Sequence, residues 1–172
     1  MERDEYLALR SVYEPPKPRL IVVAESPPLS GKYFYDPSGK VTEPLFAALM
    51  DQVGMKPTLK ELGLSRLKDE GWLLVDATYE PVNGYKATQK KLVIKRDYHK
   101  LLSDLTRVNP DRATPQILIK VNVCRLLKEP LKKDGFIVLN CDQAVPFPSN
   151  GQQGRFRSLF SVLINKAKLT PQ

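Results

Sequence analysis

The sequence predicts a three-layer α/β/α protein, in which helices cover both faces of a central, mostly parallel sheet of four strands. Four short apolar runs predict the strands, and they begin at Leu20, Trp72, Gln116 and Phe136. Segments with helical patterns lie between them, and continuous apolar strands that alternate with helices are typical of a parallel sheet buried on both faces. The length of 172 residues suits one such domain.

The first nineteen residues predict a lead-in and a strap. We expect a short helical segment, followed at 14–18 by three prolines that favour extended backbone. A single α/β domain then covers 20–172.

Apolar patterns predict each element of that domain in order. Residues 20–23 predict a strand, and the amphipathic segment 43–52 predicts a helix that tolerates Pro44 in its first turn. The remaining predictions are a helix over 59–69, a strand over 72–77, a helix over 99–108, strands over 116–123 and 136–141, and a helix from about 154 to 168. The apolar face of this last helix consists of Phe156, Leu159, Phe160, Leu163 and Ile164.

The net charge of +8, from 27 Lys and Arg against 19 Asp and Glu, favours an anionic partner such as nucleic acid. Basic residues are frequent in the polar segment 84–96, which is either part of a binding surface or a solvated face.

Cysteine usage and hydropathy exclude several classes of protein. Cys124 and Cys141 cannot form a disulfide framework or a four-thiolate metal site within one chain. Because no ligand cluster is evident, we expect no metal and no organic cofactor. The sequence has no apolar signal-peptide region and no run long enough to cross a bilayer. We therefore expect a soluble, cytoplasmic monomer that does not associate with membranes.

Carboxylates stand at the ends of two predicted strands. Glu25 follows the first apolar run and opens the segment ESPPLSGKYFY, and Asp76 ends the strand predicted over 72–77. Ligands of open α/β sheets bind beyond the carboxyl ends of the strands. Two carboxylates in one desolvated pocket are expected to raise the pKa of one of them.

Three short motifs carry a resemblance to a known family. Residues 24–28, Ala-Glu-Ser-Pro-Pro, resemble the first signature of the uracil-DNA glycosylase superfamily, and Phe-Pro-Ser-Asn at 147–150 resembles the second. Between them, Leu-Leu-Val-Asp at 73–76 resembles the end of the second strand in that superfamily, where a polar residue recognises the base. The resemblance spans roughly 20–165 and implies a fold of the same layered type. It also implies hydrolysis of the N-glycosidic bond of a damaged or mismatched base, such as uracil or a related deaminated base, in DNA repair.

The chain departs from these signatures at four positions. Ala24 and Pro28 replace glycines, Asp76 replaces asparagine, and Phe147 stands where many members carry a catalytic histidine. The chain is most similar to branches without an iron–sulfur cluster, and its segment 33–37 resembles the mismatch-specific and hypoxanthine-excising branches.

The resemblance implies a role for each motif residue. Glu25 activates water or stabilises positive charge on the sugar. Phe34, with Tyr33 and Tyr35 as the next choices, stacks on the extruded base, while Asp76 and Ser26 contact it. The residues expected to bind DNA are Pro148, Ser149, Asn150, Gly151, Arg155 and Arg157.

Other interpretations remain open for these residues. In a purely structural interpretation, Glu25 caps a loop or pairs with a surface lysine, and Asp76 bonds loop amides beside Thr78. The arginines then belong to a solvated helix start. Core packing is the other interpretation of Tyr33, Phe34 and Tyr35, but three consecutive aromatics on an extended segment cannot all face inward, so we expect at least one to lie at a surface or pocket.

Two other enzyme classes lack their patterns. Ser30-Gly31-Lys32 follows a strand as in a phosphate-binding P-loop, but Ser26 and Tyr33 stand where the first glycine and the magnesium-binding hydroxyl belong. The lone His99 has no nucleophile or acid at a motif spacing. The alternative that remains is a non-catalytic nucleic-acid-binding module with the same fold.

Overall fold

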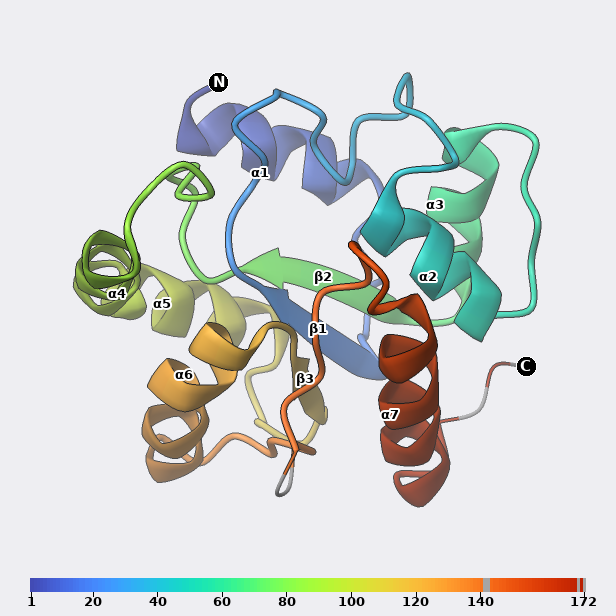
Figure 1. Ribbon diagram of the computed structural model, residues 1–172. Coiled ribbons are helices and arrows are strands. Elements are labelled where there is room, and N and C mark those ends of the chain that lie inside the picture. Colours follow the sequence, from blue (N-terminus) through green and yellow to red (C-terminus); the bar gives the residue numbers. More distant parts are fainter. Residues whose placement is uncertain (141–142, 170, 172) are drawn as a thin grey trace.

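The computed structural model describes residues 1–140, 143–169 and 171, and it is built around a small parallel sheet (Figure 1). Three strands form this sheet: β1 (Leu20–Ala24), β2 (Trp72–Asp76) and β3 (Gln116–Leu118). Their order is β2-β1-β3, and both neighbouring pairs are parallel. The predicted α/β class and the parallel sheet are confirmed.

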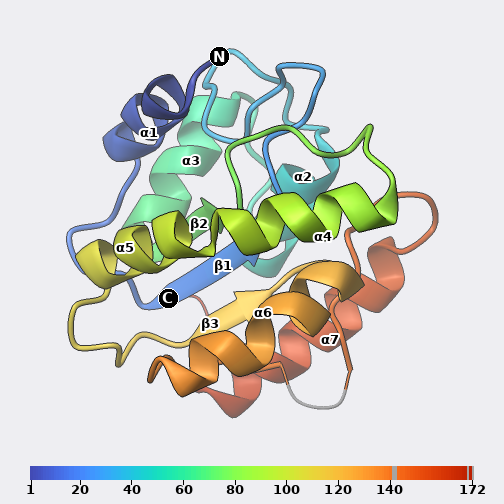
Figure 2. The same cartoon turned by 90° about the vertical axis from the view of Figure 1, so that its left-hand side faces the viewer.

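Seven helices surround the sheet in the described part of the chain. They are α1 (Arg3–Val12), α2 (Pro44–Gln52), α3 (Lys60–Asp69), α4 (Ala87–Arg96), α5 (Tyr98–Val108), α6 (Val121–Lys133) and α7 (Gln153–Lys166). Figures 1 and 2 show α4, α5 and α6 on one face of the sheet and α2, α3 and α7 on the other. This layering explains why all three strands are buried along their whole length.

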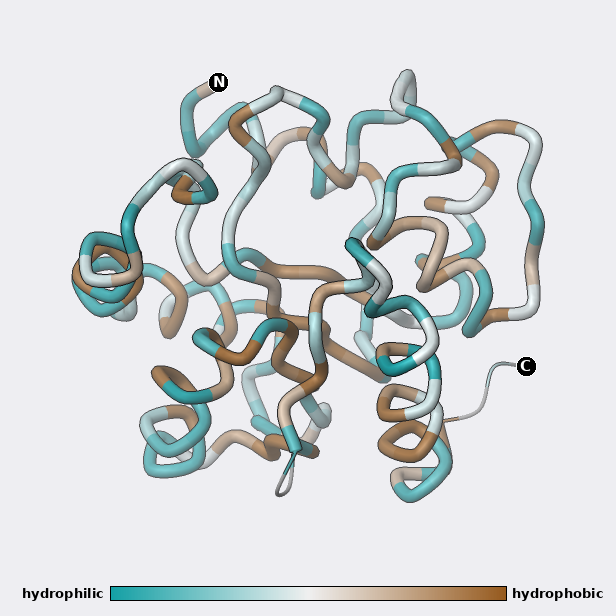
Figure 3. Tube along the Cα trace, in the orientation of Figure 1, coloured by the Kyte–Doolittle hydropathy of each residue, from teal (hydrophilic) through white to brown (hydrophobic). Residues whose placement is uncertain are grey.

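The core lies between the sheet and the inner faces of the helices. The strands form the apolar centre of the trace (Figure 3). Helix α7 packs against it with Phe156, Phe160, Leu163 and Ile164, four of the five residues predicted for that face. The predicted lead-in helix is confirmed as α1, which contributes the buried side chains of Tyr6 and Arg10.

The prediction of a fourth strand over 136–141 is wrong within the described residues, and Cys141 lies outside them. The described part of the segment lies beside β3 but pairs with it through one isolated bridge, Gln116 with Val138; a second bridge, Ile119 with Val145, lies beyond both. The side chain of Asn140 takes the place of a strand backbone here. It accepts a hydrogen bond from the Leu118 N–H at 2.6 Å and donates one to the Leu118 carbonyl at 3.0 Å. An amide side chain satisfies the edge of β3 and ends the regular ladder.

The prediction of a strand over 116–123 is too long. Strand β3 ends at Leu118, and Lys120 has a φ of +78°, which turns the chain into α6. Helix α6 buries Val123, Cys124, Leu127 and Leu131, a spacing that follows a helical face. The valines that begin this helix prolong the apolar pattern of β3 and hide the boundary between the two elements.

The basic segment 84–96 contains a helix that its polar composition did not predict. Helix α4 buries Val93 and Ile94 near its carboxyl end, and the rest of it is largely exposed. With so short an apolar stripe, the helical pattern is weak in the sequence.

The chain path creates a crevice between β1 and β3. From β1 the chain passes through α2 and α3 to β2, and from β2 it crosses back over β1 to β3. The segments that follow β1 and β3 therefore lead to opposite faces, α2 on one and α6 on the other (Figures 1 and 2). Open α/β sheets bind ligands at such a point.

Within the described residues, no helix is both long enough and apolar enough to span a bilayer. The same residues contain no group of three or more His, Cys, Asp or Glu side chains placed to hold a metal ion.

Candidate active site

A cleft of about 610 Å³ opens at the carboxyl ends of the strands. Seven residues singled out from the sequence line it: Glu25, Ser26, Tyr33, Phe34, Asp76, Ser149 and Asn150. Lys120 and Phe147 line it as well. The fold thus gathers four chain segments that are far apart in the sequence around one cavity.

Glu25 is a buried carboxylate with several partners. Its side chain is attached directly after β1 and is 4% exposed. Lys120 Nζ and Asn122 Nδ2 donate hydrogen bonds to its two oxygens, and Lys90 Nζ lies 3.7 Å from Oε2. Burial acts to raise the pKa of Glu25, but the hydrogen bond and charge of Lys120, together with the bond from Asn122, outweigh it, and the pKa is lowered. Glu25 is therefore an ionised carboxylate at neutral pH.

Asp76 lies at the end of the neighbouring strand, and its pKa is shifted in the opposite direction to that of Glu25. It pairs in register with Ala24, so it stands next to the start of the Glu25 segment, and it is also 4% exposed. Its Oδ2 atom has no hydrogen-bond partner in the described part of the protein. Burial, opposed by Arg10 and assisted by Asp104, raises the pKa of Asp76 to about 7. Asp76 thus exchanges its proton near neutral pH.

The expected rise of one carboxyl pKa occurs at Asp76, with burial as its largest cause, but Glu25 does not contribute to it as expected. The carboxylate whose charge raises the pKa of Asp76 is Asp104 of α5, rather than Glu25. Since Lys120 and Lys90 surround the charge of Glu25, its effect on the neighbouring strand is compensated.

The three consecutive aromatic residues are all buried, and two of them line the cleft, which agrees with the expectation that at least one lies at a surface or pocket. Tyr33 and Tyr35 are almost fully enclosed, and Phe34 is 8% exposed. The segment is a turn rather than an extended strand, since Tyr33 N–H bonds the Gly31 carbonyl and Asp36 N–H bonds the Tyr33 carbonyl. A turn points successive side chains in different inward directions. Tyr33 and Phe34 nevertheless form part of the cleft wall.

Contacts behind the aromatic wall hold it in place. The Tyr33 ring meets the Tyr6 ring edge-on at a centroid distance of 4.7 Å. The Phe34 ring lies 5.0 Å from that of Tyr35 and 6.0 Å from that of Phe46. Such packing makes the wall rigid, as a stacking surface for a planar ligand requires.

The loop before α7 contributes Ser149 and Asn150 to the lining of the cleft. Asn150 and Gly151 have φ values of +50° and +81°, and Gln152 N–H donates to the Ser149 carbonyl at 3.0 Å, so the loop is tightly turned. Ser26 also lines the cleft, and its Oγ is fixed by a hydrogen bond that it accepts from Val82 N–H at 3.2 Å.

The other residues expected to bind DNA lie outside the cleft lining. Pro148 and Arg157 line a separate cavity of about 330 Å³, in which Arg157 Nε donates to Asp51 Oδ2 at 2.6 Å. Gly151 and Arg155 are exposed at the start of α7. Neither arginine therefore lines the cleft that contains the two carboxylates.

Sequence reasoning missed the residues that hold Glu25. Lys120 and Asn122 follow β3 directly, and Lys90 comes from α4. The positive φ of Lys120 places its side chain over the crevice, with Nζ 5.5 Å from the Phe147 ring centroid. A lysine at the carboxyl end of a strand is a usable signal for a site residue. The strand predicted over 116–123 was too long, however, and placed Lys120 inside the strand instead of at its end.

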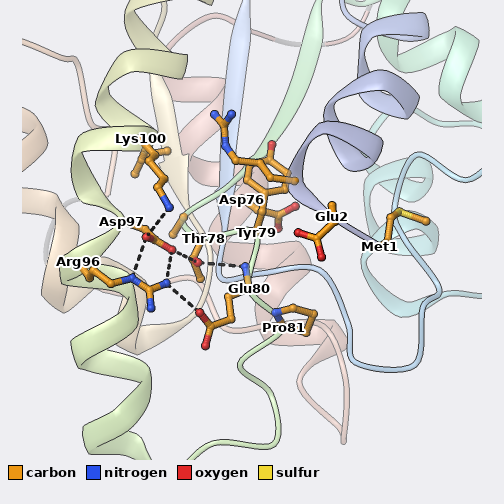
Figure 4. Close-up of a pocket in the computed structure, with 13 residues that line it drawn as sticks. Met1, Glu2, Asp76, Thr78, Tyr79, Glu80, Pro81, Arg96, Asp97 and Lys100 are labelled. Carbon is orange, nitrogen blue, oxygen red and sulfur yellow. Dashed lines mark hydrogen bonds and ion pairs between the residues drawn. The ribbon is translucent and has the colours of Figure 1, made fainter.

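Asp76 also lines a second cavity of about 310 Å³ on its other side. Figure 4 shows that the polar groups there bond one another. Asp97 accepts hydrogen bonds from Thr78 at 2.7 Å and Arg96 at 2.8 Å, and Arg96 also pairs with Glu80. This network satisfies its own charges, whereas the Asp76 oxygen remains without a partner.

Comparison of the chain with protein-family models, curated proteins and solved structures finds no match.

Proposed function

We propose that this protein is a DNA glycosylase that hydrolyses the N-glycosidic bond of a damaged or mismatched base, uracil or a related deaminated base, in DNA repair. The supporting observation is that Glu25 and Asp76, at the carboxyl ends of adjacent strands, line one cleft together with the aromatic wall of Tyr33 and Phe34. The volume of the cleft is within the range of small-molecule sites and is sufficient for an extruded base.

Glu25 suits the sugar side of this reaction. Cleavage of the N-glycosidic bond develops positive charge on the sugar, and an ionised carboxylate fixed by Lys120 and Asn122 stabilises that charge without reorganising. The same oxygen atoms accept a hydrogen bond from the attacking water and orient it. Because its pKa is lowered, Glu25 contributes more through electrostatics and orientation than as a strong base.

Asp76 suits the base edge. A deaminated base presents a carbonyl where its parent presents an amino group. With a pKa of about 7, Asp76 is protonated in a large fraction of molecules at neutral pH, and the protonated carboxyl donates a hydrogen bond to that carbonyl. The ionised form repels it. Excision of such a base therefore falls as the pH rises above about 7.

Oligonucleotides that carry uracil, hypoxanthine, xanthine or an alkylated base test the proposal, with alkaline cleavage reporting abasic sites. We expect Glu25→Gln to lower the excision rate by about 100- to 1000-fold, as removal of other transition-state stabilisers does. Glu14→Gln is the matched control, because Glu14 is also an ion-paired glutamate, bonded to Arg107 at 2.7 Å, outside the cleft lining. If the wild-type protein releases none of these bases, the proposal is wrong.

A non-catalytic nucleic-acid-binding module is the second candidate. The observation that favours it is the engagement of Glu25 by Lys120, Asn122 and Lys90, which leaves its oxygens already bonded. If the protein is a non-catalytic binding module, Glu25→Ala leaves DNA binding nearly intact, and neither the wild type nor any variant excises a base. In an enzyme, the same change abolishes excision.

A further inference from the structure

A second groove, of about 680 Å³, adjoins the cleft on the face covered by α4 and α6. Figure 2 shows these two helices side by side in front of the sheet. The groove is lined by the start of α4 and the first turns of α6, and Glu25 and Lys120 belong to its lining as well as to that of the cleft. The two cavities therefore lie next to each other and share a wall formed by Glu25 and Lys120.

The charge in this groove is strongly positive. Its lining contains Lys90, Lys91, Lys120 and Arg125, and one carboxylate, Glu25. Lys120 and Lys90 both face the Glu25 Oε2 atom. Lys91 and Arg125, from opposite helices, are exposed and have no ion-pair or hydrogen-bond partner among the described residues. Two cations thus remain free to bind a ligand.

The groove also offers apolar and aromatic surface. Tyr85 is 40% exposed, and its hydroxyl donates to Glu80 Oε1 at 2.9 Å, which fixes the ring at the groove wall. Val121 lines the same groove and is 42% exposed. An anchored aromatic ring beside free cations is the combination that binds unpaired bases and their phosphates.

We propose that this groove binds a segment of single-stranded nucleic acid, with phosphates against Lys91 and Arg125 and a base stacked on Tyr85. The inference deepens the proposed function and rests on it for the path of the bound nucleic acid. The nucleic-acid strand continues past Lys120 into the cleft, where the target nucleotide meets Glu25 and Asp76. A single strand fits better than a duplex, because stacking on Tyr85 requires a base that is free of its neighbours.

Binding of a fluorescent single-stranded DNA to the full chain, measured over a series of salt concentrations, tests the groove. The variant Lys91→Glu/Arg125→Glu is compared with Lys17→Glu/Lys133→Glu, which changes the net charge equally. Lys17 and Lys133 are exposed and lie before β1 and at the end of α6, outside the groove lining. We expect the groove variant to bind at least about tenfold more weakly, with the slope of log K against log salt reduced by about 1.4, and the control variant to lose much less.

Tyr85→Leu provides a second, uncharged test. It is expected to weaken binding by at least about fivefold without changing the salt slope, since stacking releases no counterions. Thermal unfolding of each variant confirms that it is folded. Equal losses in the groove and control variants, or a duplex of the same sequence that binds more tightly than the single strand, would overturn the inference. Excision is scored separately, so a protein that binds through the groove but releases no base contradicts the proposed function alone.

Discussion

Glu25 and Asp76 stand at the carboxyl ends of adjacent strands and are equally buried, at 4% exposure each, yet their pKa values are shifted in opposite directions. Glu25 is surrounded by two lysines and an asparagine and its pKa is lowered, whereas the Asp76 Oδ2 atom has no partner and its pKa rises to about 7. The difference teaches that burial alone does not set the charge of a carboxylate. The side chains brought in from other elements decide it.

The two surroundings come from different parts of the chain. Lys120 and Asn122 reach Glu25 from the β3–α6 junction, on one side of β1. Asp76 instead faces α1 and the tyrosines, where the nearest opposing charge is Arg10, and Arg10 is already engaged by Asp104 through bonds of 2.7 Å and 2.6 Å. A cation that is committed elsewhere does little for a neighbouring carboxylate.

The largest expected effect comes from removing that cation. Arg10→Met leaves Asp104 as a buried charge without its main partner, and we expect the free energy of unfolding to fall by about 3–5 kcal/mol. Chemical denaturation measures the change. In the double variant Arg10→Met/Asp104→Leu much of the stability returns, because the uncompensated carboxylate is gone; failure to recover would assign the loss to packing instead.

Asp76→Asn tests the unpartnered carboxylate directly. Its folded pKa of about 7 lies above the ordinary value of 3.8, so the folded state holds the proton more tightly and wild-type stability falls as the pH rises between these two values. The amide does not titrate. The variant should therefore gain stability relative to wild type across this range, by about 4 kcal/mol in total. Denaturation curves at pH 4 and pH 8 measure this gain, and a pH-independent difference contradicts it.

Glu25→Gln tests the partnered carboxylate and should show the opposite sign. A glutamate with a lowered folded pKa stabilises the fold above its ordinary value of 4.5, and this stability disappears as the pH falls through the folded pKa. We expect a loss of about 1–2 kcal/mol at pH 7, since Lys120 and Lys90 are partly exposed and screened. The loss should shrink in acid. The same denaturation series compares both strand-end variants, and parallel pH profiles would remove the contrast between them.

The smallest expected effect concerns Tyr33, which lines the same cleft as Asp76. The Tyr33 hydroxyl is buried and has no hydrogen-bond partner in the described part of the structure. Tyr33→Phe removes an unsatisfied polar atom and keeps the ring, so the change in stability is within about 1 kcal/mol and is neutral or favourable. A clear loss of stability, measured by thermal unfolding, would show that the hydroxyl has a partner in solution.

Much of the fold follows from local pattern. The runs that begin at Leu20 and Trp72 are buried strands, and the amphipathic face of the last helix faces the core. Errors occurred where two elements share one pattern. The valines after Lys120 prolong the pattern of β3 although they belong to α6, and Asn140 substitutes a side chain for a strand backbone. These outcomes depend on long-range hydrogen bonds that no local pattern encodes.

The candidate site was predictable in part for the same reason. Glu25 and Asp76 stand at strand ends, and parallel strands place such ends at one edge, so the sequence predicts their proximity. Lys120, Asn122 and Lys90 were missed because their role depends on which segments meet at the crevice.

By itself, the sequence determined the α/β class, the parallel strands and the position of two acids at one edge, because continuous apolar strands that alternate with helices can be recognised from local pattern and are typical of a parallel sheet. Only the tertiary structure decided that Glu25 is ionised, that Asp76 exchanges a proton near neutral pH, and that a basic groove continues from the cleft. The physical reason is that charge states and cavities arise from groups far apart along the chain, whose distances are set by packing.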